Sequence, residues 1–347
     1  MAKLGEVCLL KAGKFVSAND ISPEYNKGLY PCFGGNGIRG YVADYTHDGE
    51  FPLIGRQGAL CGNVNLASGK FHATEHAVVV QPKIEMNVHW LYYALNAMNL
   101  GQYATGAAQP GLAVSKLEIL SIEIPNISEQ NKIAQTLYKV EQLVNFRKQQ
   151  LAKLDELVKA RFVEMFGDPV SNPMGWKRVR FDSISENLDS KRVPVTESDR
   201  KDGVYPYYGA SGIVDWINDY IFDEDILLVS EDGANLLMRS TPIAFSVSGK
   251  SWVNNHAHVV RFHDFATQKF IEVYFSLIDI SEYITGTAQP KLNQAKLNTM
   301  LFCWPPLSLQ KQFAAFVERV DQQKQTVQQS LEKLELMKKA LMQEYFG

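Results

Sequence analysis

Two stretches of the chain, residues 128–167 and 308–347, place hydrophobic side chains at alternating steps of four and three. This is the a/d rhythm of a coiled-coil helix, and no proline or internal glycine interrupts it. Ser128 and Ser308 stand where an N-cap is expected, and Gly167 and Gly347 stand at the C-terminal ends. The pattern predicts two long helices that pair along an apolar seam. The seam positions are Ile133, Leu137, Val140, Val144, Leu151, Leu154, Val158, Phe313, Val317, Val320, Val327, Leu331, Leu334 and Leu341.

The rest of the chain alternates short apolar runs with turn residues. The runs FPLIG (51–55), HAVVV (76–80) and DILLVS (225–230) are typical of short strands. Longer apolar stretches at residues 88–98 and 269–278 predict one further helix in each half. We therefore expect an α+β fold in which mixed sheets with short helices precede each long helix.

The chain contains an internal repeat. TGAAQPGLAVSKL begins at Thr105 and TGTAQPKLNQAKL at Thr285, an offset of 285 − 105 = 180. The same offset relates GKFHATEHAVVV (69–80) to GKSWVNNHAHVV (249–260), and also relates the two long helices. Further upstream, YPCFGGNGIRGYV at Tyr30 matches YPYYGASGIVDWI at Tyr205, an offset of 205 − 30 = 175. Because the blocks keep one order, the chain arose by duplication, and each copy is a globule followed by a helix.

The repeat predicts two recognition domains at residues 1–125 and 169–305, a central helix at 126–168 and a C-terminal helix at 306–347. Two like halves in one chain most simply pair about a pseudo-twofold axis, with the long helices forming an antiparallel coiled coil. A helix of about 39 residues spans on the order of 58 Å, which is roughly 17 base pairs of DNA. Such a chain would suit a bipartite site whose halves lie a fixed distance apart. The alternative is that each helix simply packs on its own domain.

Composition narrows the class of protein without naming a ligand. Hydrophobic residues make up 46% of the 347 residues and charged residues 21%, which is typical of a globular protein. No apolar run approaches the roughly 18 residues that span a membrane, and no secretion signal begins the chain. The four cysteines form no C-x-x-C pair, so we expect a cytoplasmic protein without a zinc site. The net charge of −3 does not by itself suggest DNA, although residues 177–180 and 190–192 form small basic patches.

The YP-x-[FY]-G-x-x-G-I block, the GK…HA block, the TG-x-AQP turn and the long helices together resemble type I restriction-modification specificity subunits. The resemblance covers essentially the entire chain. It implies that each globule reads one half of a split double-stranded DNA target, and that the helices set the spacer. It also implies two methyltransferase (M) subunits and restriction/translocase (R) subunits as partners. S-adenosylmethionine, ATP and Mg would belong to those partners, so this chain would hold no cofactor and no catalytic site.

Recognition residues should be polar or basic side chains that differ between the copies. The copies diverge most in charge between residues 54–65 and 229–241, and again after the two GK pairs. Gln109, Gln289, Lys116 and Lys296 recur in or after the TG-x-AQP turns, so we expect them to contact phosphate or shape the turn. The other candidates are Arg39, Arg56, Gln57, Lys70, His72, Thr74, Ser211, Asn235, Arg239, Lys250, Trp252, Asn254, Asn255 and His256.

Three motifs that resemble catalytic or metal sites lack the context that those sites need. Gly35, Gly37 and Gly40 fit GxGxxG, but a strand-like segment follows where a nucleotide site needs a helix. AFSVSGKS (244–251) lacks the first glycine of a phosphate-binding loop. The histidines near residues 72–76 and 256–258 have no accompanying ligand cluster, so we expect no metal.

Two other functions stay open from the sequence. One is a non-catalytic coiled-coil scaffold whose repeated domains bind protein or glycan, which sequence-specific, salt-sensitive DNA binding would exclude. The other is an enzyme that uses the AFSVSGKS loop, which would require nucleotide binding that Lys250→Ala abolishes.

Overall fold

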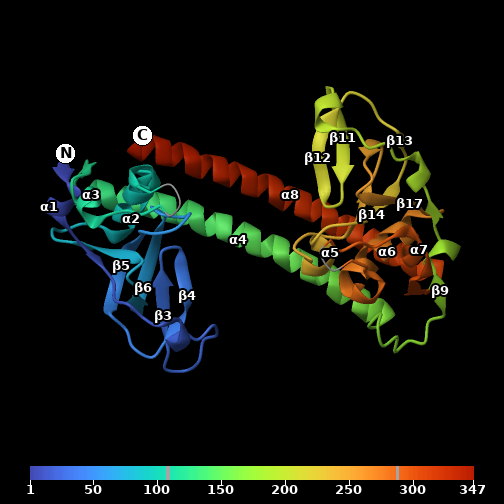
Figure 1. Ribbon diagram of the computed structural model, residues 1–347, viewed down its shortest axis with the longest axis horizontal. Helices are drawn as coiled ribbons and strands as arrows, with labels where there is room; N and C mark the ends of the chain where they lie inside the picture. The colour runs from blue at the N-terminus through green and yellow to red at the C-terminus, as the bar shows by residue number, and fades with distance from the viewer. Residues whose placement is uncertain (107–109, 287–288) are drawn as a thin grey trace. The chain divides into compact units, whose positions relative to one another are not determined.

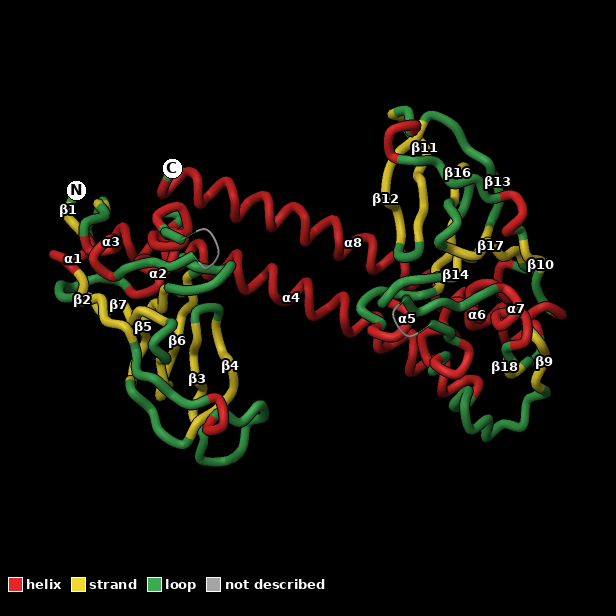
Figure 2. Tube along the Cα trace, in the orientation of Figure 1, coloured by secondary structure: helices red, strands yellow, loops and turns green. Residues whose placement is uncertain are grey.

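The computed structural model describes residues 1–106, 110–286 and 289–347 (Figures 1 and 2). The chain forms two compact units. Unit 1 comprises Met1–Lys148 and Ser330–Gly347, and unit 2 comprises Gln149–Gln329. The two long helices, α4 (Ile127–Phe166) and α8 (Leu307–Phe346), each contribute residues to both units. No helix in the described ranges is long and apolar enough to cross a membrane.

Unit 1 is built on a six-stranded sheet of order β2-β7-β5-β6-β3-β4. Its strands are β2 (Cys8–Ala12), β3 (Tyr30–Gly34), β4 (Gly37–Val42), β5 (His47–Gly55), β6 (Val64–Ala73) and β7 (Ala77–Pro82). All pairs are antiparallel except β3 with β6, which are parallel. The unit also contains β1 (Ala2–Lys3), which pairs with β8 (Ser121–Ile122), and the helices α1 (Leu4–Val7), α2 (Val88–Ala97) and α3 (Val114–Glu118).

Unit 2 repeats this plan with the sheet split in two. One sheet has the order β10-β17-β14-β15 and the other β12-β11-β16-β13. The parallel pair β11 with β16 matches β3 with β6 of unit 1. The strands are β9 (Arg178–Arg180), β10 (Glu186–Asn187), β11 (Asp202–Gly209), β12 (Gly212–Ile217), β13 (Phe222–Asp223), β14 (Ile226–Ser230), β15 (Ala244–Val247), β16 (Lys250–Val253), β17 (Ala257–Arg261) and β18 (Leu301–Cys303). The helices are α5 (Asn235–Met238), α6 (Phe265–Leu277) and α7 (Gln294–Thr299).

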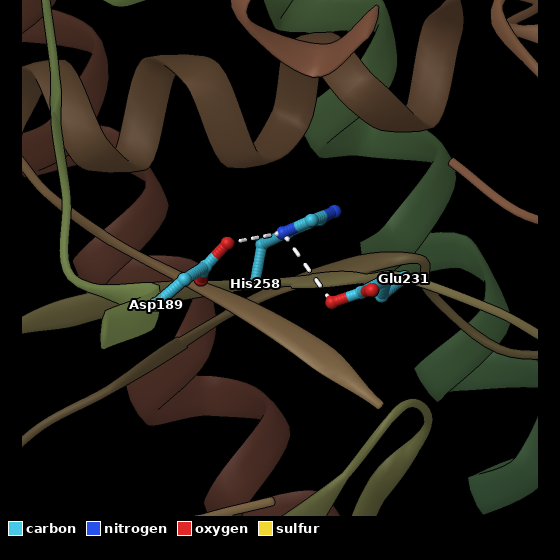
Figure 3. A group of neighbouring side chains, drawn as sticks. All are labelled: Asp189, Glu231 and His258. Atoms are coloured by element: carbon cyan, nitrogen blue, oxygen red, sulfur yellow. Dashed lines mark hydrogen bonds and ion pairs between the residues drawn. The ribbon is translucent and has the colours of Figure 1, made fainter. Parts of the chain in front are cut away.

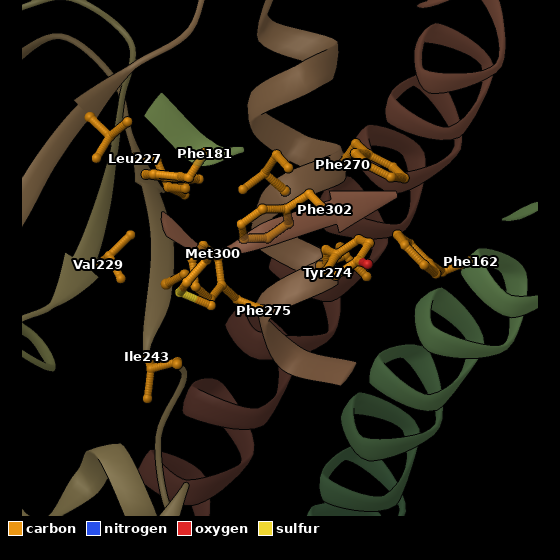
Figure 4. Close-up of a cluster of buried hydrophobic side chains, with 14 of the residues drawn as sticks. Phe162, Phe181, Leu227, Val229, Ile243, Phe270, Tyr274, Phe275, Met300 and Phe302 are labelled. Carbon is orange, nitrogen blue, oxygen red and sulfur yellow. The ribbon is translucent and has the colours of Figure 1, made fainter. Parts of the chain in front are cut away.

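The core of unit 2 includes the end of α4 and the beginning of α8. Phe162 of α4 stacks on Phe270 of α6 with ring centroids 5.2 Å apart (Figure 4). Phe166 meets Phe270 edge-on at 5.0 Å. Phe166 also contacts Phe313 of α8 at 5.4 Å. Aromatic rings of this size contribute much of a core's burial, so α4 completes unit 2.

The core of unit 1 has the reciprocal composition. Here the beginning of α4 supplies buried Ile133 and Leu137, and the end of α8 packs Phe346 against Trp90 of α2, 6.4 Å away. Trp90 and Phe270 occupy the same position in the two copies, as do Phe346 and Phe166. Each core is therefore completed by the start of one long helix and the end of the other.

Within each unit α4 and α8 run antiparallel. In unit 1, Lys338 pairs with Glu141 at 2.7 Å and Arg147 donates to Ser330 at 3.1 Å, so numbers fall along α8 as they rise along α4. In unit 2, Lys324 pairs with Asp155. Every predicted seam residue is buried or half-buried. The alternative in which each helix packs only on its own domain is excluded, because both helices enter both cores.

Three predicted helix starts were wrong by a short distance. Helix α4 begins at Ile127, and its cap is Asn126, whose side-chain oxygen accepts from the Glu129 N–H at 3.0 Å, so Ser128 lies inside the helix. Helix α8 begins at Leu307 directly after Pro306, so Ser308 is not its cap either. The predicted helix 269–278 begins earlier, at Phe265, behind an Asp264 cap. Nothing tests the four domain boundaries themselves, which stay a prediction.

A buried glutamine ties each long helix to the helix before it. In unit 1, Gln130 donates to the Pro125 carbonyl at 2.8 Å and accepts from the Asn87 N–H at 2.9 Å. In unit 2, Gln310 donates to the Pro305 carbonyl at 2.9 Å and accepts from the Thr267 hydroxyl at 2.7 Å. The glutamines are 2% and 0% exposed, so these bonds replace lost water contacts and fix where each helix begins.

Candidate nucleic-acid interface

Backbone hydrogen bonds join the two ends of the TG-x-AQP loop in each unit. The residue after the loop bonds to the segment that follows β5 in unit 1 and β14 in unit 2. In unit 1 the backbones of Thr105 and Gly111 exchange two hydrogen bonds of 2.8 Å, and the Leu112 N–H donates to the Arg56 carbonyl at 2.9 Å. In unit 2, Thr285 and Lys291 pair in the same way. The structure therefore brings the predicted loop beside the predicted segment at residues 56–58, although Gln109 lies outside the described residues.

In unit 1 three further segments converge on the turn between β6 and β7. The Arg56 N–H donates to the His76 carbonyl at 3.0 Å, and the Thr74 N–H donates to the Phe33 carbonyl at 2.9 Å. Glycines permit this approach. A Cβ at Gly55 would lie 1.9 Å from the carbonyl oxygen of Gly35, and a Cβ at Gly13 would lie 2.0 Å from that of Ala73. The backbones are close enough to place the side chains of residues 56 and 72–76 around one site.

That site in unit 1 holds polar atoms that the protein itself does not satisfy. Of the eight buried side-chain atoms without a hydrogen-bond partner among the described residues, five lie here. They are Arg56 Nε, His72 Nδ1, Thr74 Oγ1, Glu75 Oε2 and His76 Nδ1. Each unpaired buried polar group costs about 1–3 kcal/mol, so such a concentration is typical of a site that binds something from outside the chain.

At the equivalent site in unit 2, the charged side chains pair with one another. Glu231, which occupies the position of Arg56, is bonded by Arg192 at 2.6 Å and by Lys291 at 3.0 Å. His258 is 1% exposed and faces Asp189 Oδ2 with Nδ1 at 2.6 Å, as Figure 3 shows, while its Nε2 faces the Leu292 carbonyl at 2.7 Å. No sequence motif groups Asp189, Glu231 and His258, because they are far apart in the chain.

Asp189, Glu231 and His258 have the side chains of a metal site, but their contacts are those of an ion-pair network. Both ring nitrogens of His258 already face oxygen acceptors, so neither offers a free lone pair to a metal. Arg192 and Lys291 already neutralise the carboxylates. Burial alone would raise the pKa of Asp189, but the hydrogen bond and the charge of His258 outweigh it and lower that pKa. For Glu231, burial is likewise outweighed, mainly by the hydrogen bond from Arg192, and its pKa is lowered.

A lysine lies over tyrosine rings at the same place in both units. The ammonium of Lys70 is 4.6 Å from the Tyr45 ring centroid, and that of Lys250 is 4.5 Å from the Tyr220 ring centroid. The interaction with Tyr45 raises the pKa of Lys70, and the hydrogen bond with Tyr220 raises that of Lys250. Both side chains are exposed, so each unit presents one positioned positive charge.

Several other predicted contact residues have structural roles. Arg239 donates to the carbonyls of Phe275 and Ile278 at 2.9 and 3.0 Å, and Asn235 bonds the backbone of Thr241. Asn254 accepts from the His256 N–H at 2.8 Å, and the Trp252 indole donates to the Val193 carbonyl at 2.6 Å. These intramolecular bonds occupy the side-chain donors and acceptors that would otherwise be free to bind base edges.

The predicted contacts thus differ in accessibility, and whether any of them touches DNA stays a prediction. His72 and Thr74 are buried, with Thr74 at 0% exposure, so both support the turn from beneath. Lys116 is half-buried and donates to the Tyr103 carbonyl at 3.4 Å. The exposed residues are Arg39, Gln57, Lys70, Ser211, Lys250, Asn255, His256, Gln289 and Lys296.

The nucleotide-like motifs form hairpins. Gly35 and Asn36 make the turn between β3 and β4, so a strand follows GxGxxG. AFSVSGKS spans β15, a turn and the start of β16. Neither motif precedes a helix, so neither has the geometry that uses a helix N-terminus to hold phosphate.

A duplicated recognition fold on two shared helices has clear relatives. The sequence profile described as "Type I restriction modification DNA specificity domain" matches residues 1–156 and 173–336. The chain therefore belongs to this family.

Curated relatives include the type I restriction enzyme EcoprrI specificity subunit of Escherichia coli, 53% identical over 143 residues. A putative specificity subunit of Haemophilus influenzae is 32% identical over the same length. Each alignment covers 41% of this chain and 36% of the relative.

Solved structures extend the likeness to the whole fold. The S subunit of the type I restriction-modification system from M. genitalium superposes with a TM-score of 0.67 at 16% identity. That superposition covers 99% of this chain and 95% of the other. A chain from a structure of type I R-M complex assembly gives a TM-score of 0.52 at 13% identity, covering 99% and 96%. These structures share the fold.

The closed network of unit 2 should make its stability depend on acid pH. We expect Asp189→Asn to lower the free energy of unfolding at pH 7 by about 3–5 kcal/mol, because it removes one partner of a buried ionic network. The pKa of Asp189 is lower in the folded protein than in the unfolded chain, where the pKa of an Asp is near 3.9. The ionised carboxylate therefore stabilises the folded state fully at a pH above this unfolded-state pKa. That stabilisation is lost as the pH falls through the folded-state pKa. Urea unfolding from pH 7 down to pH 3 should therefore show the difference between the wild-type protein and the variant narrowing below about pH 4.

The exposed Asp225→Asn is the matched control, and it should change stability by less than about 0.5 kcal/mol. A difference between the wild-type protein and Asp189→Asn that stayed constant down to pH 3 would contradict the assignment of Asp189 as a paired carboxylate.

Proposed function

We propose that this chain is the DNA-reading specificity subunit of a type I restriction-modification complex, with each unit reading one half of a split target. The observation that carries the proposal is that one backbone frame is built twice with different polar side chains on it. Such a frame suits a target whose half-sites differ. Family membership supports the same reading.

In this proposal the chain binds and positions, and its partners carry out the chemistry. Two methyltransferase subunits would use S-adenosylmethionine to modify adenines, and restriction/translocase subunits would use ATP and Mg. The chain itself would be non-catalytic and cytoplasmic. Its role in the reaction is to bring a methyltransferase to one sequence, since binding energy on DNA is what selects the site.

The two lysines over tyrosines suit phosphate contacts. Because Lys70 and Lys250 recur at one position in both copies, they cannot account for a difference between half-sites. A charge that is held at a fixed place and is the same in both units fits a contact to the DNA backbone, which positions without specifying sequence.

The decisive test is to express the chain with its neighbouring methyltransferase and to map methylated adenines across the host genome. We expect a split motif with a fixed spacer that disappears when this chain is omitted. Unmodified DNA, with a methyltransferase that is active alongside another specificity subunit, would overturn the proposal and favour a scaffold that binds protein or glycan.

Removing the paired lysines should weaken binding without changing the target. In the methyltransferase complex, Lys70→Ala and Lys250→Ala should each reduce the slope of log K against log salt concentration by about one. Affinity should fall by a similar factor for cognate and non-cognate duplexes, as measured by fluorescence anisotropy across a salt series. Loss of affinity for the cognate duplex alone would show that these lysines read bases.

A further inference from the structure

The two units differ in charge at a place where their backbones are the same. The N–H of Arg56 donates to the His76 carbonyl at 3.0 Å, and that of Glu231 donates to the His256 carbonyl at 2.9 Å. Their own carbonyls accept from Leu112 at 2.9 Å and from Leu292 at 2.8 Å. A basic side chain thus stands in unit 1 where an acidic one stands in unit 2.

Unit 2 satisfies this position internally. Arg192 and Lys291 hold Glu231, and the neighbouring Asp232 pairs with His256 at 2.9 Å. The Glu231 side chain is 12% exposed. Both oxygens of this carboxylate already bind cationic side chains, so neither is free to accept a hydrogen bond from a base edge.

Unit 1 leaves the same position open. Arg56 is half-buried with Nε unpartnered, and the residue equivalent to Lys291 is Gly111, which supplies no charge. Glu75 contacts His76 through Oε1 at 3.2 Å, and its Oε2 has no partner. The Glu75 side chain is 34% exposed as a whole, while Oε2 itself is buried, so Oε2 would meet a base only where the base enters the site.

We propose that Arg56 and Glu75 are specificity-determining residues that read base edges of one half-site, and that unit 2 does not read through Glu231. This inference rests on the proposed function. The guanidinium matches the O6 and N7 acceptors of guanine, and the carboxylate accepts from the amino group of cytosine. A carboxylate beside DNA is repelled by phosphates, so it is tolerated only where a base offers it a donor.

The carboxylate of Glu75 can distinguish a base that presents a hydrogen-bond donor from one that presents an acceptor. A carboxylate only accepts hydrogen bonds, so it rejects a base that presents another acceptor at that place. An amide also donates, so Glu75→Gln should admit such a base. Arg56→Gln should likewise lose its preference for guanine, because the bidentate fork is gone.

The test compares the wild-type chain, Glu75→Gln, Arg56→Gln and Glu231→Gln, each in complex with the methyltransferase. Each complex is given duplexes in which both half-sites are randomised, and the methylated molecules are sequenced. The two unit 1 variants should lose about tenfold or more of the discrimination at base pairs of one half-site only. Glu231→Gln should leave the motif unchanged at both half-sites and lower the melting temperature.

Each other outcome has a distinct meaning. Unchanged motifs in both unit 1 variants, or an equal loss of methylation on all sequences, would overturn the inference, because Arg56 and Glu75 would then be structural. A change of motif in Glu231→Gln would overturn the claim that unit 2 is closed there. A wild-type complex that methylates no defined motif would overturn the proposed function, and this inference with it.

Discussion

The burial of both ends of each long helix is the constraint on which the rest of the structure depends. Phe162 and Phe166 of α4 complete the aromatic core of unit 2, and Phe346 of α8 completes that of unit 1. Neither copy of the repeat closes its core with its own helix alone. A mutation that empties one of these positions should therefore cost stability as a core cavity does, although it lies near the end of a helix.

The two units share some contacts and differ in others. The buried glutamines, the hydrogen-bonded ends of the TG-x-AQP loops and the lysine–tyrosine contacts recur in both units. The charges around residues 56 and 231 do not recur, and one unit leaves open what the other neutralises. The same backbone hydrogen bonds thus hold different side chains at this position in the two units.

The sequence predicted the repeat, the α+β class and the two long helices, because periodicity and internal likeness can be recognised without any knowledge of tertiary contacts. It placed the caps wrongly because Asn126 and Ser128 are both good capping residues, and only the geometry decides between them. It could not separate Arg56, which has an unpaired donor, from Arg239, which is bonded to two carbonyls. Nor could it see the Asp189–His258 pair, which joins residues 69 apart in the chain.

In the proposed function, two half-sites are read by two units that share the long helices. The most direct measurement is to insert one heptad into both helices, after Lys148 in α4 and after Gln329 in α8, and to map the methylated motif. Seven residues add about 10 Å at 1.5 Å each, or roughly three base pairs, and a heptad preserves the seam. We expect a longer spacer between unchanged half-sites. An unchanged spacer in a folded, active complex would contradict it.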